Sequence, residues 1–147
     1  MLGWPVAADA LPGPAHSAAI TVSPPRAGAT AVVVKLVLGY EMQCGYPGPG
    51  PVVVTLPPGE RVGRTLARSA VVVDGRPAVS VAVSGRTVTI GLAPAPQVMC
   101  DVIGPGRLTV LFLASAGLGN PPRAGSYTVR AARGSASFSA VFSISAA

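Results

Sequence analysis

The chain has 147 residues, of which 50% are hydrophobic and 11% are charged, with a formal net charge of +6 at pH 7. This length favours one domain that buries its own core, and the many Val, Ile and Leu residues exclude a disordered chain. With one histidine, five carboxylates and two cysteines, the chain offers few groups for an active site, so we expect no enzyme and no cofactor.

The N-terminal residues are typical of the last parts of a secretory signal. Residues 7–19 combine an apolar stretch with small residues that suit a cleavage site, although the basic region that normally precedes them is missing. We therefore expect residues 1–19 to be a residual signal peptide or a Pro/Ala-rich tail, and 20–147 to be a single domain. The expected location is outside the cell or at its surface. No run is long and apolar enough to predict a transmembrane helix.

The two cysteines favour the same compartment. Cys44 and Cys100 are far apart in the sequence, and neither belongs to a short-spaced Cys or His pair of the kind that binds zinc. A disulfide is the economical interpretation for an exported domain. The alternative is a pair of buried free thiols in a cytosolic protein.

In chain order, the apolar runs alternate with Gly and Pro clusters, a pattern typical of an all-β protein. The predicted strands are 20–23, 31–42, 52–56, 70–73, 78–83, 87–92, 107–114, 127–132 and 137–145. The Asp74-Gly75 turn predicts a hairpin between 70–73 and 78–83. In the last strand, Phe and Ile alternate with serine, which predicts one face on a core and one in water.

The segment 60–69 is predicted to be an irregular crossover. It carries Arg61, Arg64 and Arg68, the densest group of positive charge in the chain, and these form a possible patch for an anionic partner. The other arginines lie mostly at turns and aromatic residues are few, so we expect no specific binding of nucleic acid.

Eight or nine short strands separated by turns predict an antiparallel two-sheet β-sandwich with immunoglobulin-like architecture. Within residues 116–129 the sequence reads AGLGNPPRAGSYTV. This phrase resembles immunoglobulin-like β-sandwich modules of exported bacterial and archaeal surface proteins, in which A-G-[IL]-x-N-P ends one strand and G-[ST]-Y opens the next. The resemblance covers about residues 20–145 and implies the same fold and an exported location.

The residues of this phrase also predict a structural corner made by Asn120, Pro121, Gly125 and Tyr127. Proline fixes φ and biases Asn120 toward an extended conformation, whereas Gly125 can take the positive φ of a tight corner. Tyr127 is expected to bury its ring while its hydroxyl finds a partner near the corner.

The function predicted from these observations is a non-catalytic structural or binding module at the bacterial cell envelope. Its expected partner is an envelope polymer or another surface protein. The alternative is a small copper-binding or carbohydrate-binding module. Cleavage after Ala15 would expose an N-terminal His16, as in copper proteins that use an N-terminal histidine, with Met42, Met99, Cys44 and Cys100 as soft ligands. Carbohydrate binding would need Tyr40 and Tyr46 exposed beside each other.

Overall fold

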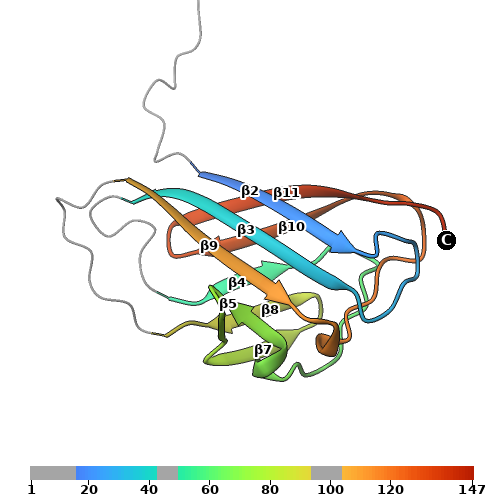
Figure 1. Ribbon diagram of the computed structural model, residues 1–147, viewed down its shortest axis with the longest axis horizontal. Helices are drawn as coiled ribbons and strands as arrows, with labels where there is room; N and C mark the ends of the chain where they lie inside the picture. Colours follow the sequence, from blue (N-terminus) through green and yellow to red (C-terminus); the bar gives the residue numbers. More distant parts are fainter. Residues whose placement is uncertain (1–15, 43–49, 94–103) are drawn as a thin grey trace, which may run out of the picture.

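The computed structural model describes residues 16–42, 50–93 and 104–147. They form two antiparallel sheets of five strands each, packed face to face as a sandwich (Figure 1). The prediction of an all-β sandwich is confirmed, and the described residues contain ten strands rather than eight or nine.

The first sheet has the strand order β2-β3-β9-β5-β6. Its strands span His16–Ser23 (β2), Val33–Met42 (β3), Gly104–Phe112 (β9), Val71–Val73 (β5) and Arg76–Pro77 (β6). β2 begins at His16, so residues 16–19 form its first half and pair with β3. From the sequence alone, these four residues are expected in the signal-like segment 1–19.

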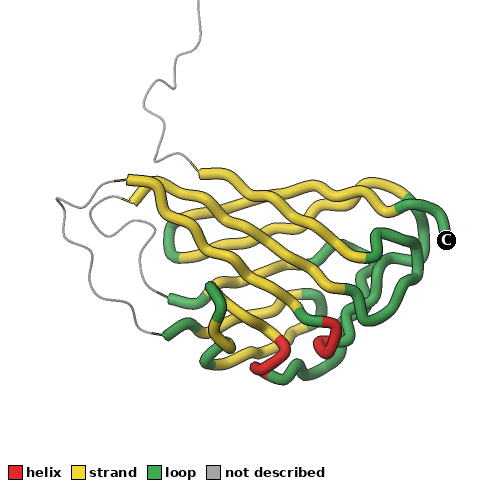
Figure 2. Tube along the Cα trace, in the orientation of Figure 1, coloured by secondary structure: helices red, strands yellow, loops and turns green. Residues whose placement is uncertain are grey.

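The second sheet has the order β11-β10-β4-β8-β7. Its strands span Ala136–Ile144 (β11), Gly125–Arg133 (β10), Val52–Thr55 (β4), Thr87–Gly91 (β8) and Ser80–Ser84 (β7). Two short 3-10 turns, η1 (Arg68–Ala70) and η2 (Ala114–Ala116), contact each other at one end of the sandwich (Figure 2).

The predicted hairpin around Asp74-Gly75 is wrong in its second strand. The turn joins β5 to β6, and β6 contains only Arg76 and Pro77 because proline has no N–H to extend a ladder. The chain then crosses to the other sheet through the buried Ala78, and β7 pairs with β8 instead. The short β6 accounts for the additional strand.

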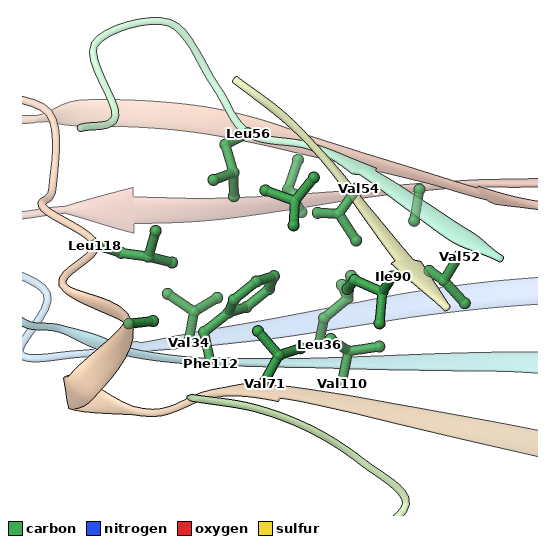
Figure 3. Close-up of a cluster of buried hydrophobic side chains, with 14 of the residues drawn as sticks. Val34, Leu36, Val52, Val54, Leu56, Val71, Ile90, Val110, Phe112 and Leu118 are labelled. Carbon is green, nitrogen blue, oxygen red and sulfur yellow. The ribbon is translucent and has the colours of Figure 1, made fainter. Parts of the chain in front are cut away.

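The core lies between the sheets and consists of alternate residues from nearly every strand. Phe112 of β9, Leu36 of β3 and Ile90 of β8 are among its largest fully buried side chains (Figure 3). In β11, burial alternates residue by residue, with Phe138, Phe142 and Ile144 among the residues inside and its three serines and Val141 outside, as the sequence predicted. This period-two pattern fixes which side of each strand faces outward.

The sandwich is closed on one side by contact between its outer strands β2 and β11. His16 of β2 contacts the ring of Phe138 of β11 edge to face, with a centroid distance of 5.3 Å. Beyond β11, the N–H of Ser145 donates to the carbonyl of Pro25, and the N–H of Ala27 donates to the carbonyl of Ser145. These contacts cover the edges of both strands.

Candidate functional site

The two outward faces of the sandwich differ in chemistry. On the sheet β2-β3-β9-β5-β6, β3 buries Val34, Leu36 and Leu38, so its odd-numbered residues point outward. Polar residues of β2 and β9, among them Thr21 and Thr109, also point outward on this sheet, but on β5 and β9 the outward Val72 and Leu111 extend the apolar surface that begins on β3. We call this surface the aliphatic face; its half-buried members are Val33, Val37, Val72, Leu111 and Leu113.

The strand register brings the members of the aliphatic face close together, with Lys35 and Thr109 between them, and Thr109 lies opposite Val37. Leu111 lies opposite Val72 on one side and Lys35 on the other, and Val37 is two residues along β3 from Lys35. The exposed Lys35 is a charge in the middle of this surface, but its methylene stem can lie along apolar neighbours while the ammonium reaches water. Because its five aliphatic side chains are partly exposed and lie close together, this face is a candidate contact surface.

The outer face of the other sheet is made mostly of short hydroxyl side chains, with Val53, Val141 and Arg130 among them. Its strands bury Val54, Val88 and Val129 on the inside, and the register places Thr55 opposite Thr87, and Arg130 opposite Ser139. We call this surface the hydroxyl face; its members are Thr55, Thr87, Thr89, Thr128, Ser137, Ser139 and Ser143.

An open hollow of about 460 Å³ lies on the hydroxyl face. Its lining includes Arg86, Arg130 and the hydroxyl residues Thr55 and Thr128. The Arg86 guanidinium donates to the carbonyl of Leu56 at 2.6 Å, which fixes it at the rim. Guanidinium and hydroxyl donors together suit an anionic group, so this hollow is where an acidic polymer would find cationic donors on this face.

Asn120 joins the loop that follows β2 to the loop that precedes β10. It is 1% exposed, and its Nδ2 donates to the carbonyls of Pro24 and Arg26, each at 2.8 Å. Its backbone N–H donates to the carbonyl of Ala29 at 2.8 Å. Asn120 is therefore committed to holding these loops together, although its buried Oδ1 has no hydrogen-bond partner among the described residues.

The other residues of the predicted corner lie around Asn120 and at the start of β10. The Tyr127 hydroxyl donates to the carbonyl of Arg123 at 2.6 Å, and its ring lies 6.0 Å from that of Phe142. Gly125 has a φ of 153°, and Pro121 is buried and accepts a bond from the N–H of Gly28. A tyrosine bonded to a backbone carbonyl a few residues upstream also occurs in immunoglobulin sandwiches.

Arg61 of the predicted anionic-partner patch has a structural contact. It pairs with Gly119 through both backbone groups, and its guanidinium donates to the carbonyl of Gly28 at 3.1 Å. A Cβ at Gly119 would lie 2.8 Å from the Nε of Arg61, so a larger residue there would displace the Arg61 side chain. Arg64 and Arg68 are exposed, and the patch itself stays a prediction.

The residues of the metal and carbohydrate alternatives lie mostly outside the described residues. Cys44, Cys100, Met99 and Tyr46 belong to that part of the chain, so the disulfide stays a prediction too. Tyr40 is half-buried and packs against the core. Residues 16–42, 50–93 and 104–147 hold no group of three or more His, Cys, Asp or Glu side chains that would bind a metal ion.

Over the same residues, no helix has the length and apolar character needed to span a membrane.

Glu60 is a buried acid that the sequence did not single out. It ends a turn in which its N–H donates to the carbonyl of Pro57 at 3.2 Å, with Pro58 and Gly59 at the central positions and a φ of 90° at Gly59. Its side chain is only 7% exposed, and burial raises its pKa from 4.5 to about 7. No hydrogen bond or ion pair from the described residues reaches its carboxylate.

Comparison with known proteins supports the fold and gives no family. No protein-family model matches the chain, and no curated protein matches it. Among solved structures, the chain is similar to one described as BslA, a bacterial hydrophobin, with a TM-score of 0.54 and 20% sequence identity. The similarity covers 90% of this chain and all of that one. At this identity, it shows a shared fold.

The difference between the two outer faces was missed by sequence reasoning. The run from Val32 to Leu38 is apolar at both odd and even positions except for Lys35, so the sequence alone does not reveal which residues point outward. A signal was present in the other sheet: Thr87 and Thr89 alternate with Val88 and Ile90, as the serines of β11 alternate with its aromatic residues.

Proposed function

We propose that this protein is an exported, non-catalytic structural module of the bacterial cell surface, which contacts an apolar surface through its aliphatic face and presents its hydroxyl face to water. The observation that carries the proposal is the contrast between the two faces. Burial of apolar side chains against an apolar surface is favourable, whereas serine and threonine hydroxyls lose hydrogen bonds to water if they are buried unpaired.

Two further observations support this proposal. The chain shares its fold over the whole length of a protein described as a bacterial hydrophobin. The phrase at 116–129 and the signal-like residues 7–19 support export. Copper or carbohydrate binding gains no support from the described residues, since Tyr40 packs on the core rather than forming an exposed platform.

The proposal predicts that charges on the aliphatic face strongly weaken adsorption to an apolar surface. In the double variant Val37→Glu/Leu111→Glu, both replaced residues are half-buried and point outward. Each buried carboxylate costs at least about 1.4 kcal/mol, so the affinity for an alkyl-coated sensor is expected to fall by about tenfold or more per substitution. Adsorption is measured by quartz crystal microbalance.

The matched control is Thr89→Glu/Thr128→Glu on the hydroxyl face. Both threonines are also half-buried and outward-facing, and the control changes the net charge by the same amount. It is expected to adsorb like the wild type. Equal losses in the two double variants, or no loss in either, would contradict the proposed orientation.

A further inference from the structure

β7 is an edge strand without the charges and prolines that often block pairing with another chain. It is the outer strand of its sheet, and its sequence Ser-Val-Ala-Val-Ser contains no charge and no proline. Such an edge is a template for a further strand. The remaining outer strands are protected: β6 consists of Arg76 and Pro77, and β2 and β11 cover each other.

Among the described residues, the backbone groups of β7 that have no partner strand are those of Val81 and Val83. Ser84 and Thr87 flank the two-residue turn Gly85-Arg86, and such a flanking pair exchanges both of its hydrogen bonds. By alternation, Ala82 also bonds within the sheet to Thr89. The N–H and C=O of the two valines therefore point away from β8, toward the open edge.

The sequence of β7 reads the same in both directions around Ala82. A second copy of the strand, laid antiparallel with Ala82 opposite Ala82, places each Val81 opposite Val83 and each Ser80 opposite Ser84. The valines are the residues whose backbone groups face the edge, so both the N–H and the C=O of each one find a partner. Such a pairing is isologous, and it closes after two copies.

We infer that β7 is a self-recognition edge, through which two copies of this chain pair antiparallel about Ala82 and join their hydroxyl faces into one continuous sheet. We call the paired strands the seam. The twofold axis of the seam is perpendicular to the sheet, so the aliphatic faces of both copies lie on the same side.

The side chains at the edge suit this arrangement. Val81 and Val83 face inward, are half-buried and pack against the core. In the seam, the second copy covers the parts of these two side chains that are still exposed to water. Val79, just before β7, is one of two large hydrophobic residues that are exposed among those the structure describes, at 50%. The register brings it beside Gly85 of the second copy, which has no side chain to obstruct it.

The inference is tested by disulfide trapping. In the Ala82→Cys variant, the two cysteines face each other across the axis in a non-hydrogen-bonded pair, about 4.5 Å apart at Cα, within the range of a disulfide. The variant is expected to become a covalent dimer on mild oxidation, seen on a non-reducing gel. Ala82 is exposed on the outer face, so the substitution leaves the core intact.

The matched control is Ser84→Cys on the same strand. In the proposed register its two cysteines are four residues apart along the seam, about 13 Å, too far for a bridge. The wild-type protein is oxidised in parallel, because any covalent dimer that it forms must come from Cys44 or Cys100, which both variants also contain. A covalent dimer that forms equally well in both variants, or an Ala82→Cys protein that stays monomeric on oxidation, would overturn the inference.

A second measurement does not depend on cysteine. The variants Ala82→Lys and Ala82→Glu each place like charges against each other at the axis, so each is expected to sediment as a monomer. An equimolar mixture is expected to form a mixed dimer. Association of either single variant like the wild type, or no association of the mixture, would count against the seam. The inference is tested separately from the proposed function, since pairing through β7 does not require contact with an apolar surface. The double variants of the aliphatic and hydroxyl faces leave the sequence of β7 unchanged.

Discussion

Replacing Phe112 by alanine is expected to lower the free energy of unfolding by about 3 to 5 kcal/mol. Phe112 is 0% exposed, and its two register partners are Val34 of β3 and Val71 of β5. Its ring points between the two sheets, with Val34 and Val71 beside it (Figure 3). Removing the ring leaves a cavity that the rigid strands around it cannot fill by collapse.

The comparison variant is Val141→Ala on β11. Val141 is 65% exposed on the outer face, so its loss is expected to change the free energy of unfolding by no more than about 0.5 kcal/mol. Urea denaturation followed by circular dichroism gives both values. If the Phe112→Ala variant were as stable as Val141→Ala, then Phe112 would not lie at the centre of the core.

Stability is expected to fall as the pH rises from about 4.5 to about 7, because of Glu60. Burial raises the pKa of its carboxyl from 4.5 to about 7 in the folded protein, so the folded state binds the proton more tightly than the unfolded chain. The stability that Glu60 contributes is therefore fully present below its pKa in the unfolded chain. It is lost as the pH rises through its pKa in the folded protein. At about 1.4 kcal/mol per pKa unit, the loss is about 3 kcal/mol.

The Glu60→Gln variant isolates this contribution, since glutamine has nearly the same shape and no titration. Relative to the wild type, it is expected to gain about 3 kcal/mol of stability between about pH 4 and about pH 8. Denaturant unfolding of both proteins at several pH values measures the difference, and contributions from all other groups cancel. Parallel pH profiles for the two proteins would show that Glu60 is solvated in the folded state.

Much of the fold follows from local patterns. The alternation of aromatic and serine residues in β11 predicts its buried and exposed sides, and the valine-rich runs predict the positions of β3 and β4. The sequence does not reveal that Pro77 ends β6 after two residues and sends the chain to the opposite sheet. This crossing depends on the burial of Ala78, which is a property of the packed sandwich.

The candidate site is less predictable, because it depends on contacts between distant residues. Asn120 bonds to Pro24, 96 residues away, and nothing local to either residue indicates that pairing. The burial of Glu60 likewise arises from the packed structure rather than from its neighbours in the sequence. The two faces become visible only when the register aligns outward-facing residues of separate strands.

Radical footprinting of the protein on intact cells of the organism that carries its native gene is the most direct test of a two-faced surface module. Leu111 reports on the aliphatic face and Val141 on the opposite one, with protein in solution as the reference. The account predicts that the protein is labelled on unbroken cells, with Leu111 protected from oxidation and Val141 oxidised as in solution. Equal labelling of Leu111 on cells and in solution, or protein recovered only after lysis, would contradict it.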